Sequence, residues 1–214
     1  MKSLRDIIMS CSVGSALHTI AYRYFLRKKL PKGHCGKGSF IRPPSWINKG
    51  GLEKIYIGDD SHISCDCVLF CTGGNLIIKN HVAISVGLTV VTGNHLRSVG
   101  MWFTESEAKF NEGKDVVVED DVWIASNVTL LSGVHIGRGA TIGAGAVCTK
   151  NIPPYAIAMG NPAKVVGFNY TPEQIIEHEK MLYPEEERLP MELLQKNHKK
   201  YLIDRAAEIK MFLK

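Results

Sequence analysis

The sequence lacks several features that define common functional classes. It has no uncharged apolar run long enough to span a bilayer, and no basic stripe interleaved with aromatic residues. The formal net charge is only +5 over 214 residues, which gives no argument for nucleic acid binding. The chain also contains no C-x2-C pair, no H-x4-H pair and no G-x-S-x-G nucleophile elbow. We therefore expect one soluble domain with appendages and no nucleic acid partner.

The cysteines give no disulfide framework. Cys35 and Cys148 fall on positions that we assign below to a buried repeat, and Cys67 falls on a position suited to small residues. Such residues are typical of reduced core thiols, which favours a cytoplasmic location. A metal cluster of Cys65, Cys67 and Cys71 is the alternative, although their spacing differs from that of known zinc sites.

A six-residue repeat dominates the second half of the chain. Large aliphatic residues recur at every sixth position, and an aliphatic residue, often a small one, follows four positions after each. The first set is Val118, Ile124, Leu130, Ile136 and Ile142, continued by Cys148, and the second is Val122, Val128, Val134, Ala140, Ala146 and Ile152. A period of six fits neither a helix nor simple strand alternation, but it is the signature of a parallel β-helix.

Weaker runs of the same repeat lie upstream. They are Cys35, Ile41 and Ile47, then Ile57, Ile63 and Leu69, then Ile78, Ile84 and Val90. A one-residue slip would turn the core face outward, so the breaks at 47–57, 69–78 and 90–118 are expected to be loops that re-enter in register. We predict a mainly β solenoid over residues 31–168, with three hexads per coil, turn glycines at 137–145 and a protruding loop at 96–115.

The first 30 residues are predicted to form a separate helical segment. Basic residues precede the weakly apolar stretch 7–22, which is the charge order of a signal peptide. Polar residues dilute the stretch, however, and its apolar positions fit an amphipathic helix better. The basic residues at 23–29 most simply form a solvated face, and peripheral contact with an anionic membrane is the alternative.

The C-terminal part, residues 169–214, is predicted to be helical. Strand structure should end near Pro153 and Pro154, because proline cannot donate to a β-ladder. Thr171 and Gln174 flank Pro172 in the pattern of a capped helix start, and this helix should run to about residue 182. A second helix is expected from about residue 191 to the end. Its apolar stripe is interpreted as a packing face.

The break between Val90 and Val118 is the first place to look for chemistry. It begins with Thr92-Gly93-Asn94-His95 and continues through a long excursion. Loops that project from a rigid scaffold often carry functional sites. Histidine is the usual general base near neutral pH, so His95 is the candidate base, with a surface or packing histidine as the alternative.

Several segments resemble one family. The run from Val122 to Ala146, the segment Thr149–Tyr155 and the segment Gly160–Val165 are similar to those of the hexapeptide-repeat acetyltransferases. The V-x-T-G-N-H sequence that ends at His95 is similar to the galactoside, maltose and xenobiotic branch. The resemblance implies a left-handed parallel β-helix, a homotrimer with sites between subunits, and acetyl-CoA as cosubstrate with no metal.

The resemblance also implies a mechanism. His95 would remove the proton of an acceptor hydroxyl as that hydroxyl attacks the thioester, with no covalent acyl-enzyme. The matched position for the oxyanion-stabilising group is Ser126, which would act through its backbone amide. Ser126 as a nucleophile is the less favoured alternative, because no elbow motif surrounds it.

Further residues match the positions that hold the cosubstrate and the acceptor in this family. The resemblance places CoA against Trp123, Ala125, Ala144, Thr149, Lys150 and Lys164. Lysine suits phosphate as a point charge. We assign Asp66, Asn94 and Trp102 to the acceptor, which is expected to be a small molecule or a glycan.

Three alternatives remain open from the sequence. The acceptor could be an antibiotic or an amino group instead of a sugar hydroxyl. A metal enzyme similar to the γ-carbonic anhydrases would need three converging histidines, for which His62, His81 and His95 are available. A non-enzymatic solenoid used for assembly would bind no CoA.

Overall fold

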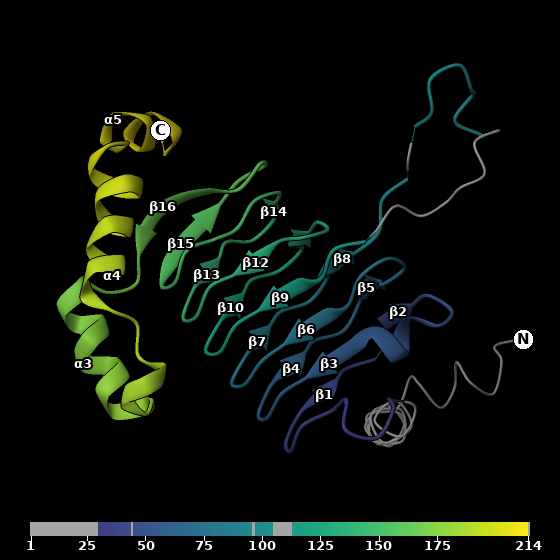
Figure 1. Cartoon of the computed structure of the whole chain (residues 1–214), viewed down its shortest axis with the longest axis horizontal. Coiled ribbons are helices and arrows are strands. Elements are labelled where there is room, and N and C mark those ends of the chain that lie inside the picture. Colours follow the sequence, from purple (N-terminus) through teal and green to yellow (C-terminus); the bar gives the residue numbers. More distant parts are fainter. Residues whose placement is uncertain (1–29, 44, 96, 105–112, 214) are drawn as a thin grey trace, which may run out of the picture.

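The computed structural model describes residues 30–43, 45–95, 97–104 and 113–213. Short strands stack in coils, and the chain visits three sheets in the same order in every coil (Figure 1). All neighbouring strands are parallel except the last pair, β15 and β16. This arrangement is the β-helix that the six-residue repeat predicts.

The three sheets differ in length. The seven-stranded sheet contains β1 (Phe40–Ile41), β4 (His62–Ile63), β7 (Ala83–Ile84), β10 (Trp123–Ile124), β13 (Thr141–Ile142), β15 (Ala156–Met159) and β16 (Lys164–Phe168). The five-stranded sheet contains β2 (Ser45–Ile47), β5 (Cys67–Phe70), β8 (Thr89–Val91), β11 (Thr129–Leu130) and β14 (Val147–Cys148). The four-stranded sheet contains β3 (Ile55–Ile57), β6 (Leu76–Ile78), β9 (Val116–Val118) and β12 (His135–Ile136).

The core is the inside of the coils. The twelve residues of the main repeat are all buried, with at most 5% exposure, at Ile152. Ladder pairing keeps them in register, so that Ile84, Ile124 and Ile142 are direct neighbours across three coils. The residue before each of these points outward because side chains alternate along a strand. Trp123, for example, is 53% exposed beside the fully buried Ile124.

Three corners join the sheets. We call the turns from the seven- to the five-stranded sheet (64–66, 85–87, 125–127 and 143–145) the first corner. The turns from the five- to the four-stranded sheet (71–75, 92–115, 131–133 and 149–151) form the second corner. The turns back to the seven-stranded sheet (58–61, 79–81, 119–121, 137–139 and 153–155) form the third corner. Left-handed backbone recurs there, at φ 58° for Asn127 and 70° for Gly145.

The sequence predicted that strand structure ends near Pro153 and Pro154, and this prediction was wrong. Strand β15 begins two residues after Pro154 and pairs with β13 in parallel. The prolines lie at the third corner, where the chain turns, and the ladder bonds on either side are made by other residues. The Gly137 amide donates to the Ile152 carbonyl, and the Gly143 amide donates to the Ala158 carbonyl.

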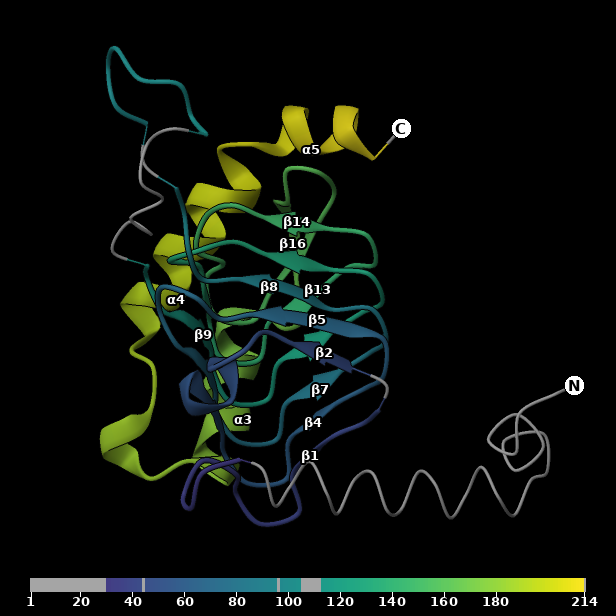
Figure 2. The same cartoon turned by 90° about the vertical axis from the view of Figure 1, so that its right-hand side faces the viewer.

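The C-terminal helices lie beside the last coils, next to β15 and β16 (Figure 1), and they are seen behind the coils in Figure 2. Helix α3 (Pro172–Leu182) starts at the predicted capping box, where Thr171 and Gln174 exchange hydrogen bonds. A 3₁₀ turn, η2 (Glu185–Glu187), leads to α4 (Met191–His198). The predicted second helix is interrupted: a π-helical segment, η3 (Lys199–Ile203), is followed by Arg205 at φ −119°, and α5 (Ala206–Phe212) then begins.

Two regions complete the chain. A 3₁₀ turn, η1 (Gly51–Lys54), fills part of the first predicted break. The predicted N-terminal helix and the basic residues at 23–29 lie outside the described residues. Within the described ranges, no helix is both long and apolar enough to cross a membrane.

Candidate active site

The long excursion leaves the solenoid at the second corner of the third coil. Strand β8 ends at Val91 and β9 starts at Val116. Ser132, in the turn of the next coil, ties the two ends together: its Oγ donates to the Thr92 carbonyl at 2.9 Å and accepts from the Lys114 amide at 3.1 Å. The buried Thr92 hydroxyl donates to the Gly74 carbonyl at 2.8 Å. The base of the excursion is therefore fixed to the coils above and below it.

His95 lies on the outer side of this base, as the sequence predicted. It is exposed, and its ring lies edge-to-face with that of Phe103, with ring centroids 5.6 Å apart. The Arg97 guanidinium lies 5.0 Å from the same ring centroid. The two acceptor candidates on this segment, Asn94 and Trp102, are also exposed. The described part of the excursion thus brings the candidate base and both of these residues to one corner.

Two of the candidate CoA residues, Thr149 and Lys150, lie on the same corner. Thr149 and Lys150 follow β14 and are exposed, two coils above the turn that begins at Thr92. Neighbouring strands are about 4.8 Å apart, so the vertical separation is roughly 10 Å. An extended pantetheine arm could bridge this distance along the corner.

A cavity of about 440 Å³ opens above this column. It contains Thr149, Lys150 and Lys164, three of the residues assigned to CoA. Sequence reasoning missed the other charged residues that line it: Lys200, Arg205 and Glu208 of the C-terminal segment. No local pattern brings these residues to Lys164, because the contact depends on how η3 and α5 fold back.

The remaining candidates gather on and beside the first corner. Ala125, Ser126 and Ala144 lie in its turns, and Trp123 is the first residue of β10, the strand that leads into one of them. Asp66 occupies the corresponding turn two coils earlier and is exposed. Within one chain the five-stranded sheet separates this group from His95. A site that uses both groups therefore requires two copies of the chain.

The Ser126 amide is available as a donor. Its carbonyl accepts from the Gly145 amide at 2.9 Å, but within the described residues no acceptor bonds its own N–H. Neighbouring amides are used: Ala125 donates to the Ile142 carbonyl and Asn127 to the Val86 carbonyl. The equivalent turn amide at Ala144 is also unbonded in this part of the chain. The free amide thus follows from the turn geometry and not from the serine side chain.

The outer face of the five-stranded sheet, between the two corners, is apolar. Trp46 is 51% exposed and stacks on Phe70 with ring centroids 5.4 Å apart. Val68 is the direct neighbour of Trp46 on the adjacent strand and is also exposed. A hollow next to Trp46 reaches Asp66. Exposed aromatic residues in such a patch are typical of protein interfaces.

The geometry excludes the three-histidine alternative within one chain. His62 points out from the seven-stranded sheet and stacks on Phe40, His81 lies at the third corner, and His95 lies at the second. In the described ranges no three His, Cys, Asp or Glu side chains are grouped so that they could hold a metal ion.

Three cysteines of the described ranges, Cys67, Cys71 and Cys148, are buried in the solenoid and form no disulfide. Burial raises the pKa of the Cys71 thiol to about 11 and that of Cys148 to about 12. These thiols stay protonated at neutral pH and are poor metal ligands or nucleophiles.

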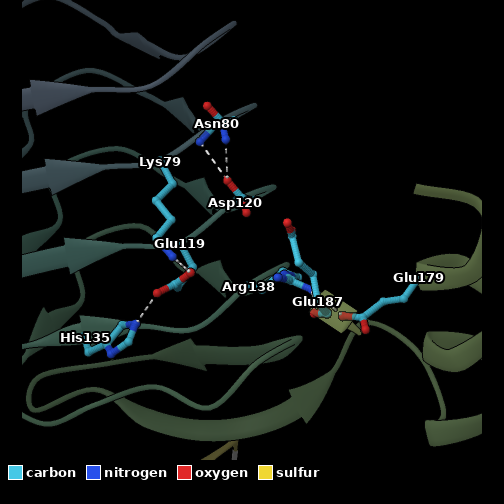
Figure 3. A network of polar contacts seen from close by, with 8 residues as sticks. All are labelled: Lys79, Asn80, Glu119, Asp120, His135, Arg138, Glu179 and Glu187. Atoms are coloured by element: carbon cyan, nitrogen blue, oxygen red, sulfur yellow. Dashed lines mark hydrogen bonds and ion pairs between the residues drawn. The ribbon is translucent and has the colours of Figure 1, made fainter. Parts of the chain in front are cut away.

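A second polar network lies where the four-stranded sheet meets the third corner, and it was not expected from the sequence (Figure 3). Glu119 accepts from His135 Nε2 at 2.7 Å and pairs with Lys79 Nζ at 2.6 Å. Each of the three residues is next to an inward repeat position in the sequence, so its side chain is expected to point outward. A comparison of these outward positions in successive coils could have revealed the network. The network borders a cavity of about 440 Å³ between this sheet and α4.

Comparison with known proteins agrees with this geometry. Residues 115–150 match the family described as bacterial transferase hexapeptide (six repeats). A galactoside O-acetyltransferase of Lactococcus lactis subsp. lactis is 32% identical over 130 residues, and this match covers 61% of the present chain and 60% of that protein. A chloramphenicol acetyltransferase of Klebsiella aerogenes is 40% identical over 73 residues, which is 34% of this chain and 35% of the other. The match thus spans less than two thirds of the length of each of these curated relatives.

A solved structure matches over a larger share. A hexapeptide-repeat acetyltransferase from Vibrio cholerae O1 biovar eltor, determined in complex with acetyl-CoA, is 31% identical with a TM-score of 0.60. The match covers 71% of the present chain and 78% of that one. Together with the coil topology, it confirms the predicted fold class. The chain belongs to the hexapeptide-repeat acetyltransferase family, whose fold is the left-handed parallel β-helix.

Proposed function

We propose that the protein transfers an acetyl group from acetyl-CoA to a hydroxyl of a sugar or polysaccharide precursor. The observation that carries the proposal is the column on the second corner. His95 lies at its lower end, Thr149 and Lys150 lie two coils above, and Lys164 lines the cavity at the top. The donor thioester would reach the base while the nucleotide phosphates remain beside the lysines.

The chemistry follows from the groups at this corner. A hydroxyl is a weak nucleophile near neutral pH, so His95 accepts its proton as the oxygen attacks the thioester carbonyl. The tetrahedral intermediate carries an oxyanion, which a backbone amide at Ser126 stabilises. When the carbon–sulfur bond breaks, the departing CoA thiolate takes the proton from His95. No covalent acyl-enzyme forms, and no metal is needed.

The assembly follows from the separation of the two corners. We propose a homotrimer in which the second corner of one copy faces the first corner of the next. Ser126, Trp123 and Ala144 of a neighbouring copy would then complete the site at His95. The exposed apolar face around Trp46 and Val68 supports burial against another copy, since such patches are unusual on monomers. Three such interfaces would close a ring.

The acceptor is proposed to bind between Asp66, Asn94 and Trp102. Carboxylate and amide groups bond sugar hydroxyls, and an exposed indole such as Trp102 provides an apolar surface for a sugar ring. The similarity to a galactoside O-acetyltransferase favours a sugar. The similarity to a chloramphenicol acetyltransferase favours an antibiotic hydroxyl as the second candidate. Buried unpaired thiols support a reducing, cytoplasmic location.

The test is calorimetric titration with acetyl-CoA, followed by an acceptor screen. Wild-type protein is expected to bind with a micromolar Kd, and Lys150→Ala/Lys164→Ala is expected to bind at least about tenfold more weakly. Acetyl transfer is then measured for galactosides, oligosaccharides, amino sugars and chloramphenicol. No binding at millimolar acetyl-CoA would overturn the proposal and favour a solenoid used for assembly. Transfer only to amines would overturn the hydroxyl acceptor.

A further inference from the structure

Helix α5 lies over the rim of the cavity that contains Lys150 and Lys164. A Cβ atom on Gly160, in the turn before β16, would lie only 2.5 Å from the Phe212 ring. The glycine therefore lets the helix approach this turn closely. The Phe212 ring centroid also lies 5.5 Å from Lys164 Nζ. These contacts place the C-terminal segment directly beside the proposed nucleotide end of the CoA site.

Glu208 joins two cations at this position. Its Oε1 accepts from Lys164 Nζ at 2.9 Å and from Arg205 Nη2 at 3.1 Å, and its Oε2 accepts from Arg205 Nε at 2.9 Å. The hydrogen bonds from Arg205 and then from Lys164 lower the pKa of Glu208 to about 2. The carboxylate is nevertheless 45% exposed. It is charged at neutral pH, and solvent or a ligand can reach it.

The cavity beside Glu208 carries more positive charge than this one carboxylate can neutralise. Lys150 and Lys200 line the same cavity, and among the described residues neither forms an ion pair. The Lys200 ammonium instead lies 4.9 Å from the Tyr201 ring centroid. Four cations and a single carboxylate therefore line one cavity. An anion with more than one charge would match this cluster better than Glu208 does.

We propose that Lys200 and Arg205 bind a phosphate group of the CoA nucleotide together with Lys164, and that Glu208 occupies the place of this phosphate until CoA binds. The inference rests on the proposed function, since it takes CoA as the ligand of the cavity. Arginine bonds carboxylate and phosphate oxygens through the same fork of donors, so the Glu208 oxygens mark where phosphate oxygens would lie. CoA binding then exchanges one ionic contact for another and releases Glu208.

Under this proposal, the cations and the carboxylate of this cluster have opposite effects on CoA affinity. Lys200 and Arg205 would increase CoA affinity, whereas Glu208 would decrease it by competing for Lys164 and Arg205. A purely structural salt bridge would behave differently, because removing either partner would then loosen α5 and weaken binding. The signs of the two effects therefore separate the two explanations.

The test compares CoA binding by calorimetry in full-length Lys200→Gln, Arg205→Gln and Glu208→Gln. Lys196→Gln and Glu192→Gln are matched controls, since both residues are exposed on α4 and line none of the described cavities. Each cation variant is expected to raise the Kd for CoA about tenfold, the loss of one charge-assisted hydrogen bond. Glu208→Gln is expected to lower the Kd about threefold or more. Thermal unfolding midpoints establish that all variants are folded.

Titration with 3′-dephospho-CoA identifies the phosphate. If the cation variants lose their effect with this analogue, the cluster binds the 3′-phosphate, and if the effect persists it binds the pyrophosphate. Wild-type CoA affinity in all three pocket variants would overturn this inference and leave the acetyltransferase proposal intact. Weaker binding by Glu208→Gln would show a structural salt bridge and overturn the competition. Absence of CoA binding in the wild type and in both controls would overturn the proposed function itself.

Discussion

Glu179 is fully buried and accepts a hydrogen bond from Arg138 Nη1 at 3.2 Å, which joins α3 to the third corner of the solenoid. The same carboxylate accepts from the Tyr155 hydroxyl at 3.1 Å and from the Leu189 amide. Burial raises the pKa of Tyr155, and the nearby Glu179 raises it further, so the phenol remains a donor at neutral pH. One side chain thus connects the coils, α3 and the segment before α4.

Removal of this carboxylate should destabilise the protein strongly. In Glu179→Ala, three donors lose their acceptor and the nearly buried Arg138 loses its counter-ion. Breaking a buried pair in this way costs about 3–5 kcal/mol. Urea unfolding measures the loss of unfolding free energy. Glu177→Ala, on the exposed side of α3, is the control and should lose about 0.5 kcal/mol or less. A loss in Glu179→Ala that equals the control would mean that the helices are not anchored here.

The Lys79–Glu119–His135 network should make stability depend on pH. Burial acts to raise the pKa of Glu119, but the hydrogen bonds from Lys79 and His135 outweigh it and hold this pKa below its usual value. A carboxylate with a lowered folded pKa stabilises the protein above its unfolded pKa, and this contribution is lost as pH falls through the folded value. Wild type should therefore exceed Glu119→Gln in unfolding free energy by about 1 kcal/mol at pH 6.

That difference should shrink progressively below about pH 4.5, the ordinary pKa of a glutamate. Denaturant titrations of both proteins between pH 3 and 7 measure it. Glu177→Gln, whose carboxylate makes none of these contacts, should follow the wild type throughout. A difference that stays constant down to pH 3 would show that Glu119 contributes by packing and not by its charge.

The alternation at β10 predicts contrasting outcomes for adjacent residues. Ile124 is fully buried, and Trp123 is 53% exposed. Ile124→Ala should cost about 2–5 kcal/mol, because it leaves a cavity in a close-packed core. Trp123→Ala should change monomer stability little but weaken the proposed contact with a neighbouring copy. Urea unfolding and sedimentation velocity measure the two effects, and a trimer unaffected by Trp123→Ala would contradict the interface.

The repeat made the coils predictable because it reports a single physical constraint. Each inward position must be apolar to fill the solenoid, so the pattern marks Ile124 and its neighbours without further information. The start of α3 was equally predictable, because Thr171 and Gln174 satisfy exposed backbone groups locally. His95 could be placed on the outside at the base of the excursion because it follows Val90, the last inward repeat position before the chain leaves the coil.

Contacts between distant parts of the chain were not predictable. Lys164 and Glu208 are 44 positions apart, and their pairing depends on the break at Arg205 that redirects α5. Proline also misled the sequence reasoning, because Pro154 lies at a corner where the coil needs no donor. Position within the coil decides whether such a residue is tolerated, and composition alone does not carry that information.

His95 should be required for turnover but not for cosubstrate binding. His95→Ala removes the group proposed to accept the acceptor proton, and general-base catalysis contributes about 10²–10⁴-fold in rate. Acetyl transfer is measured with the best acceptor from the screen, and acetyl-CoA affinity is measured in parallel. His81→Ala, at the opposite third corner, serves as the control. Full activity in His95→Ala would remove the mechanism, and equal losses in both variants would indicate a general defect.

Ala144 should control access to the donor groove. Its side chain is small and exposed on the first corner, above Ser126, and a bulky side chain there would project from the surface without entering the core. Ala144→Trp is therefore expected to leave the unfolding free energy within about 0.5 kcal/mol of wild type. If the pantetheine arm passes this wall, the indole should obstruct it and weaken acetyl-CoA binding about tenfold or more. Glu192→Trp, at an exposed position of α4 that lines neither of the two cavities described above, provides a control at a surface outside the groove. Calorimetry on both variants is decisive: equal affinity in Ala144→Trp and wild type would mean that CoA takes a different path.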